Sequence, residues 1–161
     1  MSNQPGVEQN IQLIRDYETE IFHEHNAEKI PELVSDSFTY DNPLLSEPIR
    51  GANEFAAYLR ETEEAFSDFT APFDTVVADE DVVMAEWTFT GTHDGSLEGI
   101  PPTDRRIAVP GMSRFTISDG KLDEHRSYFD TKEWLDQLGL AFPAVVLQLP
   151  KLAWRKVNRL K

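Results

Sequence analysis

Two polar residues in the first third of this 161-residue chain have types and a spacing that could serve chemistry. Tyr40 and Asn42 are two positions apart in a segment that predicts a short strand, so a hydroxyl and an amide can point to the same side. Together they could hold a water molecule or a carbonyl oxygen. Asparagine before proline is also a common end to a strand, so the pair equally fits an ordinary turn before Pro43.

His125 and Asp130 are the candidate proton carriers. They are five positions apart on one predicted strand, so their side chains point to opposite faces and cannot form a direct dyad. We expect only one of them to reach a cavity. His125 is the first candidate, because the ordinary pKa of histidine lies near physiological pH. Asp130 is the second.

Other residues that could be reactive fit simpler interpretations. His23 and His25 are two apart on a predicted helix and do not face each other, and His93 lies in a glycine-containing turn that predicts an exposed loop. Ser113 and Ser127 lack the setting of a serine nucleophile. The chain has no cysteine, and it contains no phosphate-binding loop, dinucleotide fingerprint or HExxH motif. We therefore predict no metal and no cofactor.

A predicted β-hairpin positions several of these side chains. Asp119 and Gly120, flanked by alternating apolar residues, are the strongest hairpin signal in the chain. On the first strand the more apolar face is formed by Ile107, Val109, Gly111, Ser113, Phe115 and Ile117. The second strand offers that face a mixed set, either His125, Ser127 and Phe129 or the residues between them. Because buried polar groups must be hydrogen-bonded, this mixture predicts a cavity built partly for recognition.

Pro110 complicates that assignment of faces. Proline cannot donate to a strand ladder and often marks an edge or a bulge. A bulge at this point would exchange the two faces of the sheet for the side chains that precede it.

The remaining elements predict an α+β fold. Apolar residues spaced by three or four predict a helix over 7–22 and a short one over 26–34, and Asn53 is the expected N-cap of a third that reaches Phe66. Strands are predicted over 38–41, 73–78 and 82–91, with Trp87 and Phe89 facing the core. This order predicts a curved, mostly antiparallel sheet with helices packed on one face.

Charge excludes some partners. Five of the fifteen basic residues lie in the last eleven positions, where there is no acidic residue, so the first 150 residues carry ten basic and 29 acidic residues, or −19. Such a body repels phosphate backbones, and we expect no nucleic-acid binding. The chain has neither a long apolar run nor a signal-peptide pattern, which predicts a soluble cytoplasmic protein.

The last segment, 140–161, is a basic extension that we expect to be partly helical. Lys151–Lys161 could form a basic amphipathic helix. Because a single such segment binds lipid weakly, we expect a docking helix or a solvated end and no membrane contact.

Three stretches resemble one family of small enzymes. GSLEGIPPTDRR (95–106), ISDGKLDEHR (117–126) and DQLG (136–139) look like the SnoaL-like polyketide cyclases of the nuclear-transport-factor-like superfold. The resemblance runs from Val7 to Gly139 and leaves the extension uncovered. It implies a cone-shaped domain over 1–139 whose curved sheet and helices, the latter on its concave face, enclose an apolar pocket. It also implies a homodimer or a larger oligomer.

The resemblance supports the family's fold more strongly than the family's catalytic activity. The family's histidine and its catalytic aspartate, the acid–base of an aldol ring closure, fall at His125 and Ser127. A hydroxyl with its ordinary pKa cannot replace a carboxylate as general base near neutral pH unless a partner activates it. The family's glutamine and second histidine fall at Gly111 and Ser113, whereas Asn42 matches a pocket asparagine.

The limonene epoxide hydrolases are a more distant resemblance. Tyr40, Asn42 and the stretch RSYFD (126–130) are similar to their water-binding residues and closing strand. Their Arg-x-Asp pair would fall at Trp87 and Phe89, and their second aspartate at Ser127. Aromatic residues in place of charges imply a more hydrophobic pocket.

These observations support two hypotheses. The first is a SnoaL-like pocket protein for a small hydrophobic cyclic metabolite, with Trp87, Phe89, Phe115 and Phe129 as wall and Tyr40, Asn42, His125, Ser113 and Ser127 as polar lining. If it is an enzyme, one weak acid–base suits cyclisation, isomerisation or dehydration of an activated substrate, as a polyketide cyclase-like lyase or isomerase would perform. The second is a non-catalytic ligand-binding or protein-interaction module on the same fold.

Overall fold

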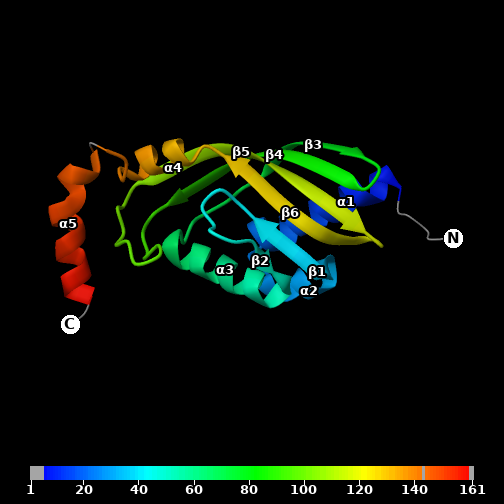
Figure 1. Ribbon diagram of the computed structural model, residues 1–161, viewed down its shortest axis with the longest axis horizontal. Coiled ribbons are helices and arrows are strands. Elements are labelled where there is room, and N and C mark those ends of the chain that lie inside the picture. The colour runs from blue at the N-terminus through cyan, green and yellow to red at the C-terminus, as the bar shows by residue number, and fades with distance from the viewer. Residues whose placement is uncertain (1–5, 143, 160–161) are drawn as a thin grey trace.

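The computed structural model describes residues 6–142 and 144–159, and its N-terminal helices and α3 lie along one face of a curved sheet (Figure 1). The helical segments are α1 (Val7–Tyr17), a π-helical continuation (Glu18–His23), a 3₁₀ turn (Ala27–Lys29), α2 (Ile30–Leu33), α3 (Gly51–Ala65), α4 (Thr131–Leu138) and α5 (Ala144–Arg159). The strands are β1 (Val34–Asp41), β2 (Ile49–Arg50), β3 (Phe73–Asp79), β4 (Val82–Thr92), β5 (Arg106–Ser118) and β6 (Lys121–Phe129).

The strands form one sheet in the order β2-β1-β6-β5-β4-β3. Neighbours are antiparallel except β1 and β6, which are parallel. This confirms the predicted α+β fold with a mostly antiparallel sheet. Both predicted hairpins form, and at the second one Asp119 and Gly120 have φ of 50° and 74°, the left-handed region that an Asp-Gly turn favours.

The assignment of faces on β5 is confirmed. Val109, Ser113 and Phe115 are fully buried, whereas Met112 on the opposite face is 45% exposed. Pro110 introduces no bulge, since the register between β4 and β5 is unbroken there. The last pair between β5 and β6 is Gly111 with Phe129, so Pro110 lies just beyond it and interrupts no ladder on that side.

The first helix follows the predicted stripe. Ile14, Tyr17 and Ile21 are buried, and after Tyr17 the backbone widens into a π-helix. The prediction for the third helix is wrong at its start: α3 begins at Gly51, two residues before Asn53. Glu54 satisfies this end of the helix by accepting from the backbone N–H of Arg50 at 3.0 Å.

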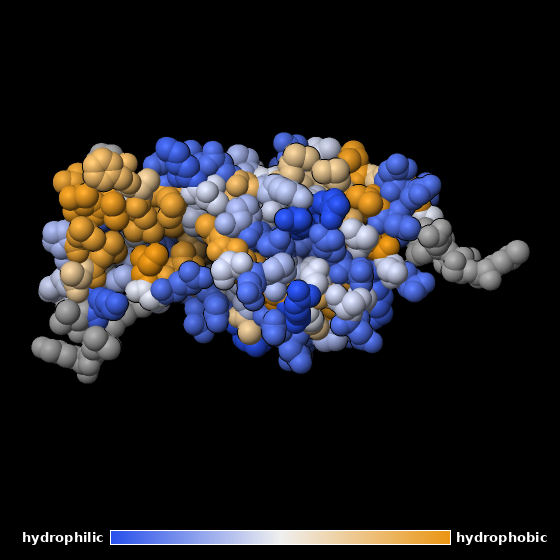
Figure 2. All heavy atoms as spheres, in the orientation of Figure 1, coloured by the Kyte–Doolittle hydropathy of each residue, from blue (hydrophilic) through white to orange (hydrophobic). Residues whose placement is uncertain are grey.

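The C-terminal helix is longer than its basic part. It begins at Ala144, contains Pro150, and runs to Arg159, while residues 160–161 lie outside the described residues. Figure 1 shows α5 standing at one end of the sheet, and Figure 2 shows hydrophobic side chains gathered there. In the described part of the chain, no helix is long and apolar enough to cross a membrane.

Candidate functional site

A cavity of about 440 Å³ lies between the sheet and the helices. Its wall is mainly aromatic and aliphatic, and the aromatic members are Phe22, Tyr40, Tyr58, Phe66, Phe69, Phe73, Trp87, Phe89, Phe129 and Trp134. Acidic residues also line it, namely Glu61 and Glu64 from α3 and Glu98 from the loop between β4 and β5. Within the described residues, no lysine or arginine does. A cavity of this size and character suits a small hydrophobic molecule.

The structure brings most of the predicted site residues to this cavity. The residues on its wall are Tyr40, Asn42, Trp87, Phe89, Ser113, His125, Ser127 and Phe129. Phe115 is not on the wall; it lies behind His125, with ring centroids 4.5 Å apart. The functional roles of all these residues stay predictions.

Asp130 does not reach the cavity. It is exposed at the N-terminus of α4, where its carboxylate accepts from the backbone N–H groups of Lys132 at 2.8 Å and Glu133 at 3.2 Å. The side chain is therefore a helix cap. The expectation that only one of His125 and Asp130 faces the cavity agrees with this placement.

Sheet register places the polar lining in adjacent rows. Tyr40 on β1 pairs with His125 on β6, and Ser127 on β6 pairs with Ser113 on β5. His125 Nε2 lies 3.0 Å from Ser113 Oγ and 3.1 Å from Ser127 Oγ, and the two serine oxygens are 3.0 Å apart. Three strands thus assemble one compact hydroxyl and imidazole cluster.

His125 differs from the sequence expectation in its pKa. The side chain is 2% exposed, and burial lowers its pKa to about 3. The imidazole is therefore neutral at physiological pH. Its choice as proton carrier rested on the ordinary pKa of histidine, which this burial does not preserve, and its catalytic role stays a prediction.

Trp87 reaches the same cluster because β5 has a glycine opposite it. Trp87 Nε1 donates to Ser113 Oγ at 2.8 Å. Trp87 and Gly111 are register partners, and a Cβ at Gly111 would lie 2.3 Å from the indole. Gly111 thus leaves the space in which the ring lies, and Trp87 lines the cavity.

Asn42 shows the turn chemistry that was one of its two interpretations, while its role in holding a ligand stays a prediction. Its Oδ1 accepts from the backbone N–H of Leu44 at 2.8 Å, which is turn chemistry. Its Nδ2 donates to the hydroxyls of Tyr58 at 2.9 Å and Tyr40 at 3.2 Å. Burial raises the pKa of Tyr40, so its phenol stays protonated at neutral pH.

Sequence reasoning missed two tyrosines of the site. Tyr17 from α1 lies 3.0 Å from His125 Nδ1, and Tyr58 from α3 lines the cavity. Both positions fit the apolar stripe of their helix, so periodicity assigns them to the core. Only the packing of each helix onto the sheet shows that their hydroxyls meet polar partners.

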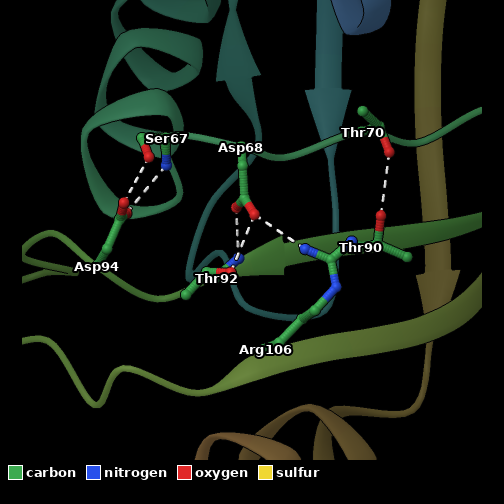
Figure 3. Close-up of polar contacts among 7 residues, drawn as sticks. All are labelled: Ser67, Asp68, Thr70, Thr90, Thr92, Asp94 and Arg106. Atoms are coloured by element: carbon green, nitrogen blue, oxygen red, sulfur yellow. Dashed lines mark hydrogen bonds and ion pairs between the residues drawn. The ribbon is translucent and has the colours of Figure 1, made fainter.

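Polar contacts outside the cavity hold part of its wall in place (Figure 3). Asp68 accepts from the backbone N–H of Thr92 at 2.6 Å, from its hydroxyl at 2.9 Å, and from Arg106 at 2.9 Å. Asp94 binds the backbone and hydroxyl of Ser67 in the same way. These hydrogen bonds lower the pKa values of both carboxyl groups. They attach the segment that carries Phe66 and Phe69 to the C-terminal end of β4.

His93 packs behind this wall, against Phe66. The prediction of an exposed loop histidine is wrong, because the side chain is fully buried. Its ring packs 5.2 Å from that of Phe66, and Nδ1 lies 3.1 Å from the Thr103 hydroxyl.

Comparison with known proteins decides the family. A family model described as SnoaL-like polyketide cyclase matches residues 12–138. The chain belongs to this family. The resemblance seen in the sequence is thereby confirmed, and the match ends before the C-terminal helix.

Two curated relatives of this SnoaL-like chain are cyclases from Streptomyces. Identity to the nogalonic acid methyl ester cyclase of Streptomyces nogalater is 41% over 61 residues, covering 38% of this chain and 46% of that protein. Identity to the aklanonic acid methyl ester cyclase DauD of Streptomyces sp. (strain C5) is 29% over 127 residues, covering 77% of this chain and 78% of that protein. The chain spans less than half of the first relative in that match.

Solved structures share the fold. A SnoaL-like protein of Jannaschia sp. CCS1 superposes with a TM-score of 0.74 at 21% identity, over 89% of this chain and 99% of that one. An LEH-like epoxide hydrolase of M. tuberculosis superposes with a TM-score of 0.65 at 20% identity, over 89% and 98%. At these identities the likeness concerns the fold alone.

Proposed function

We propose that this SnoaL-like protein binds a small, hydrophobic, cyclic polyketide-like metabolite and promotes a ring closure, isomerisation or dehydration of it. The observation that carries the proposal is the neutral His125, hydrogen-bonded to Ser113 and Ser127 on the wall of a mainly apolar cavity. Such a site orients a ligand and polarises it with neutral donors, which suits a substrate that is already activated.

The names of the relatives suggest the ligand class. Both relatives described above are named as cyclases of acid methyl esters, in which the carboxylate is masked. In this chain the cavity is lined by Glu61, Glu64 and Glu98 and, within the described residues, by no lysine or arginine. A free carboxylate on the ligand would be repelled there, so an ester is the better fit.

The rival function is binding without chemistry. The resemblance aligns Ser127 with the family's catalytic carboxylate, and the groups that contact His125 Nε2 are the hydroxyls of Ser113 and Ser127. A module that carries or senses a polyketide would need only the apolar wall and Asn42. Turnover, not affinity, separates the two functions.

The test measures both quantities on a panel of aromatic polyketide methyl esters and terpenoids. Wild type, His125→Ala, Asn42→Ala and a surface control, Glu47→Ala, are compared by calorimetry and by product analysis. We expect micromolar binding by wild type and the control, weakened about tenfold or more in the two site variants. Absence of binding across the panel would reject the pocket assignment, and binding without product would select the non-catalytic module.

We also propose that the protein is a homodimer in which α5 contacts a second copy. Large apolar side chains at this end are exposed, namely Phe142, Val146, Leu147, Leu149 and Trp154. The helix and its end carry only basic charges, whereas the rest of the chain is strongly acidic. An acidic second copy therefore fits this helix better than an anionic membrane, which the body would repel.

A further inference from the structure

The hydrogen-bond directions in the cavity can be worked out from one buried hydroxyl. Tyr17 is fully buried, and His125 Nδ1, at 3.0 Å, is the hydrogen-bond partner of its hydroxyl among the described residues. A buried O–H without an acceptor is costly, so this hydroxyl donates to Nδ1. Nδ1 must then be unprotonated.

This contact fixes the tautomer of His125. A neutral imidazole carries one ring hydrogen, and with Nδ1 as acceptor that hydrogen is on Nε2. Nε2–H can only donate, and the two oxygens in reach are those of Ser113 and Ser127. The imidazole therefore cannot accept a proton from either serine, which excludes a serine activated by His125.

The remaining hydrogens follow in order. Trp87 Nε1 can only donate, and it donates to Ser113 Oγ. The Ser113 hydroxyl then has Ser127 Oγ as its acceptor, 3.0 Å away. Ser127 in turn shares a hydrogen bond with the hydroxyl of Tyr40.

Every hydroxyl hydrogen of this network has an acceptor within it. Tyr40 is hydrogen-bonded to Tyr58 as well as to Ser127, and Tyr58 to Thr62. Asn42 Nδ2 donates to both tyrosine hydroxyls.

We propose that Tyr17 is a positioning residue that holds His125 in the Nε2–H tautomer, so that the imidazole is a hydrogen-bond donor to Ser113 and Ser127 and cannot act there as a base. This tautomer stands independently of the proposed function.

The test determines the tautomer of His125 in the ligand-free, full-length protein. Nitrogen-15 NMR of the His125 ring at pH 7 should show an unprotonated Nδ1 and a protonated Nε2. Tyr17→Phe removes the donor to Nδ1 and keeps the ring, so we expect a shift towards the other tautomer. Tyr58→Phe, a tyrosine that contacts Asn42 and not His125, is the matched control and should leave the tautomer unchanged. A protonated Nδ1 in wild type, or an unchanged tautomer in Tyr17→Phe, would overturn the assignment.

Discussion

His125 should make the stability of the fold depend on pH. Its folded pKa is about 3, against about 6.5 for an unfolded histidine. Between these values the unfolded chain binds a proton that the folded protein excludes, so unfolding becomes easier as the pH falls. The contribution is fully present above pH 6.5 and is lost progressively towards pH 3.

Urea unfolding at pH 7.5 and pH 5.0 measures this effect. At pH 5.0 the histidine should cost about 2 kcal/mol of unfolding free energy relative to pH 7.5. His125→Gln cannot titrate and should lack this component, while the carboxyl groups titrate alike in both proteins. Identical pH dependence in the two proteins would contradict the burial of a neutral imidazole, as would protonation of His125 near pH 6 in an NMR titration of wild type.

At the residue scale, strand alternation predicted more than motif reading did. Period-two parity put Ser113 on the buried face of its strand and His125 and Ser127 together on one face of the next, because facing is a local property of a strand. Parity carries no information on solvation, so the low pKa of His125 and the burial of His93 were not predictable. The capping role of Asp130 could have been predicted locally, since a carboxylate just before a helix often caps it.

At the element scale, the segment between α3 and β3 should depend on Asp68. This carboxylate joins the segment to β4 through Thr92 and to β5 through Arg106. Asp68→Ala should lower the free energy of unfolding by about 1 kcal/mol, since three hydrogen bonds at a partly exposed site are lost. It should also weaken ligand binding severalfold, because Phe66 and Phe69 on either side line the cavity.

Chemical denaturation and calorimetry with the tightest panel ligand check this prediction. Glu47→Ala, an exposed acidic residue outside the cavity wall, controls for the general effect of removing a negative charge. If Asp68→Ala matches that control in both measurements, the contacts drawn in Figure 3 do not hold the wall.

Elements with a local signal were predicted, and those that depend on distant pairing were not. The Asp-Gly hairpin and the helix stripes are set by neighbours in sequence. β2 has two residues and no periodicity to detect. The parallel pairing of β1 with β6 joins Tyr40 to His125, which no local pattern indicates, although it brings the two halves of the site together.

At the scale of the whole molecule, two apolar surfaces could form the proposed homodimer. One is the α5 end, where Leu147 is 84% and Trp154 67% exposed. The other is the outer face of the sheet, where Val77 is 57% and Met112 45% exposed. Charge distinguishes them, because only the α5 end carries a purely basic segment that complements an acidic second copy.

Paired substitutions in the full-length chain decide between these surfaces. Leu147→Ser with Trp154→Ser should convert the dimer to a monomer, and Val77→Ser with Met112→Ser, the matched control on the sheet, should not. Lys151→Glu with Lys156→Glu should weaken the dimer in the same direction, and added salt should weaken the wild-type dimer by screening the same attraction. Sedimentation velocity gives the mass in each case. A dimer that survives the α5 changes and is lost with the sheet changes would move the interface to the sheet, and a monomeric wild type would leave the exposed stripe of α5 to a different partner.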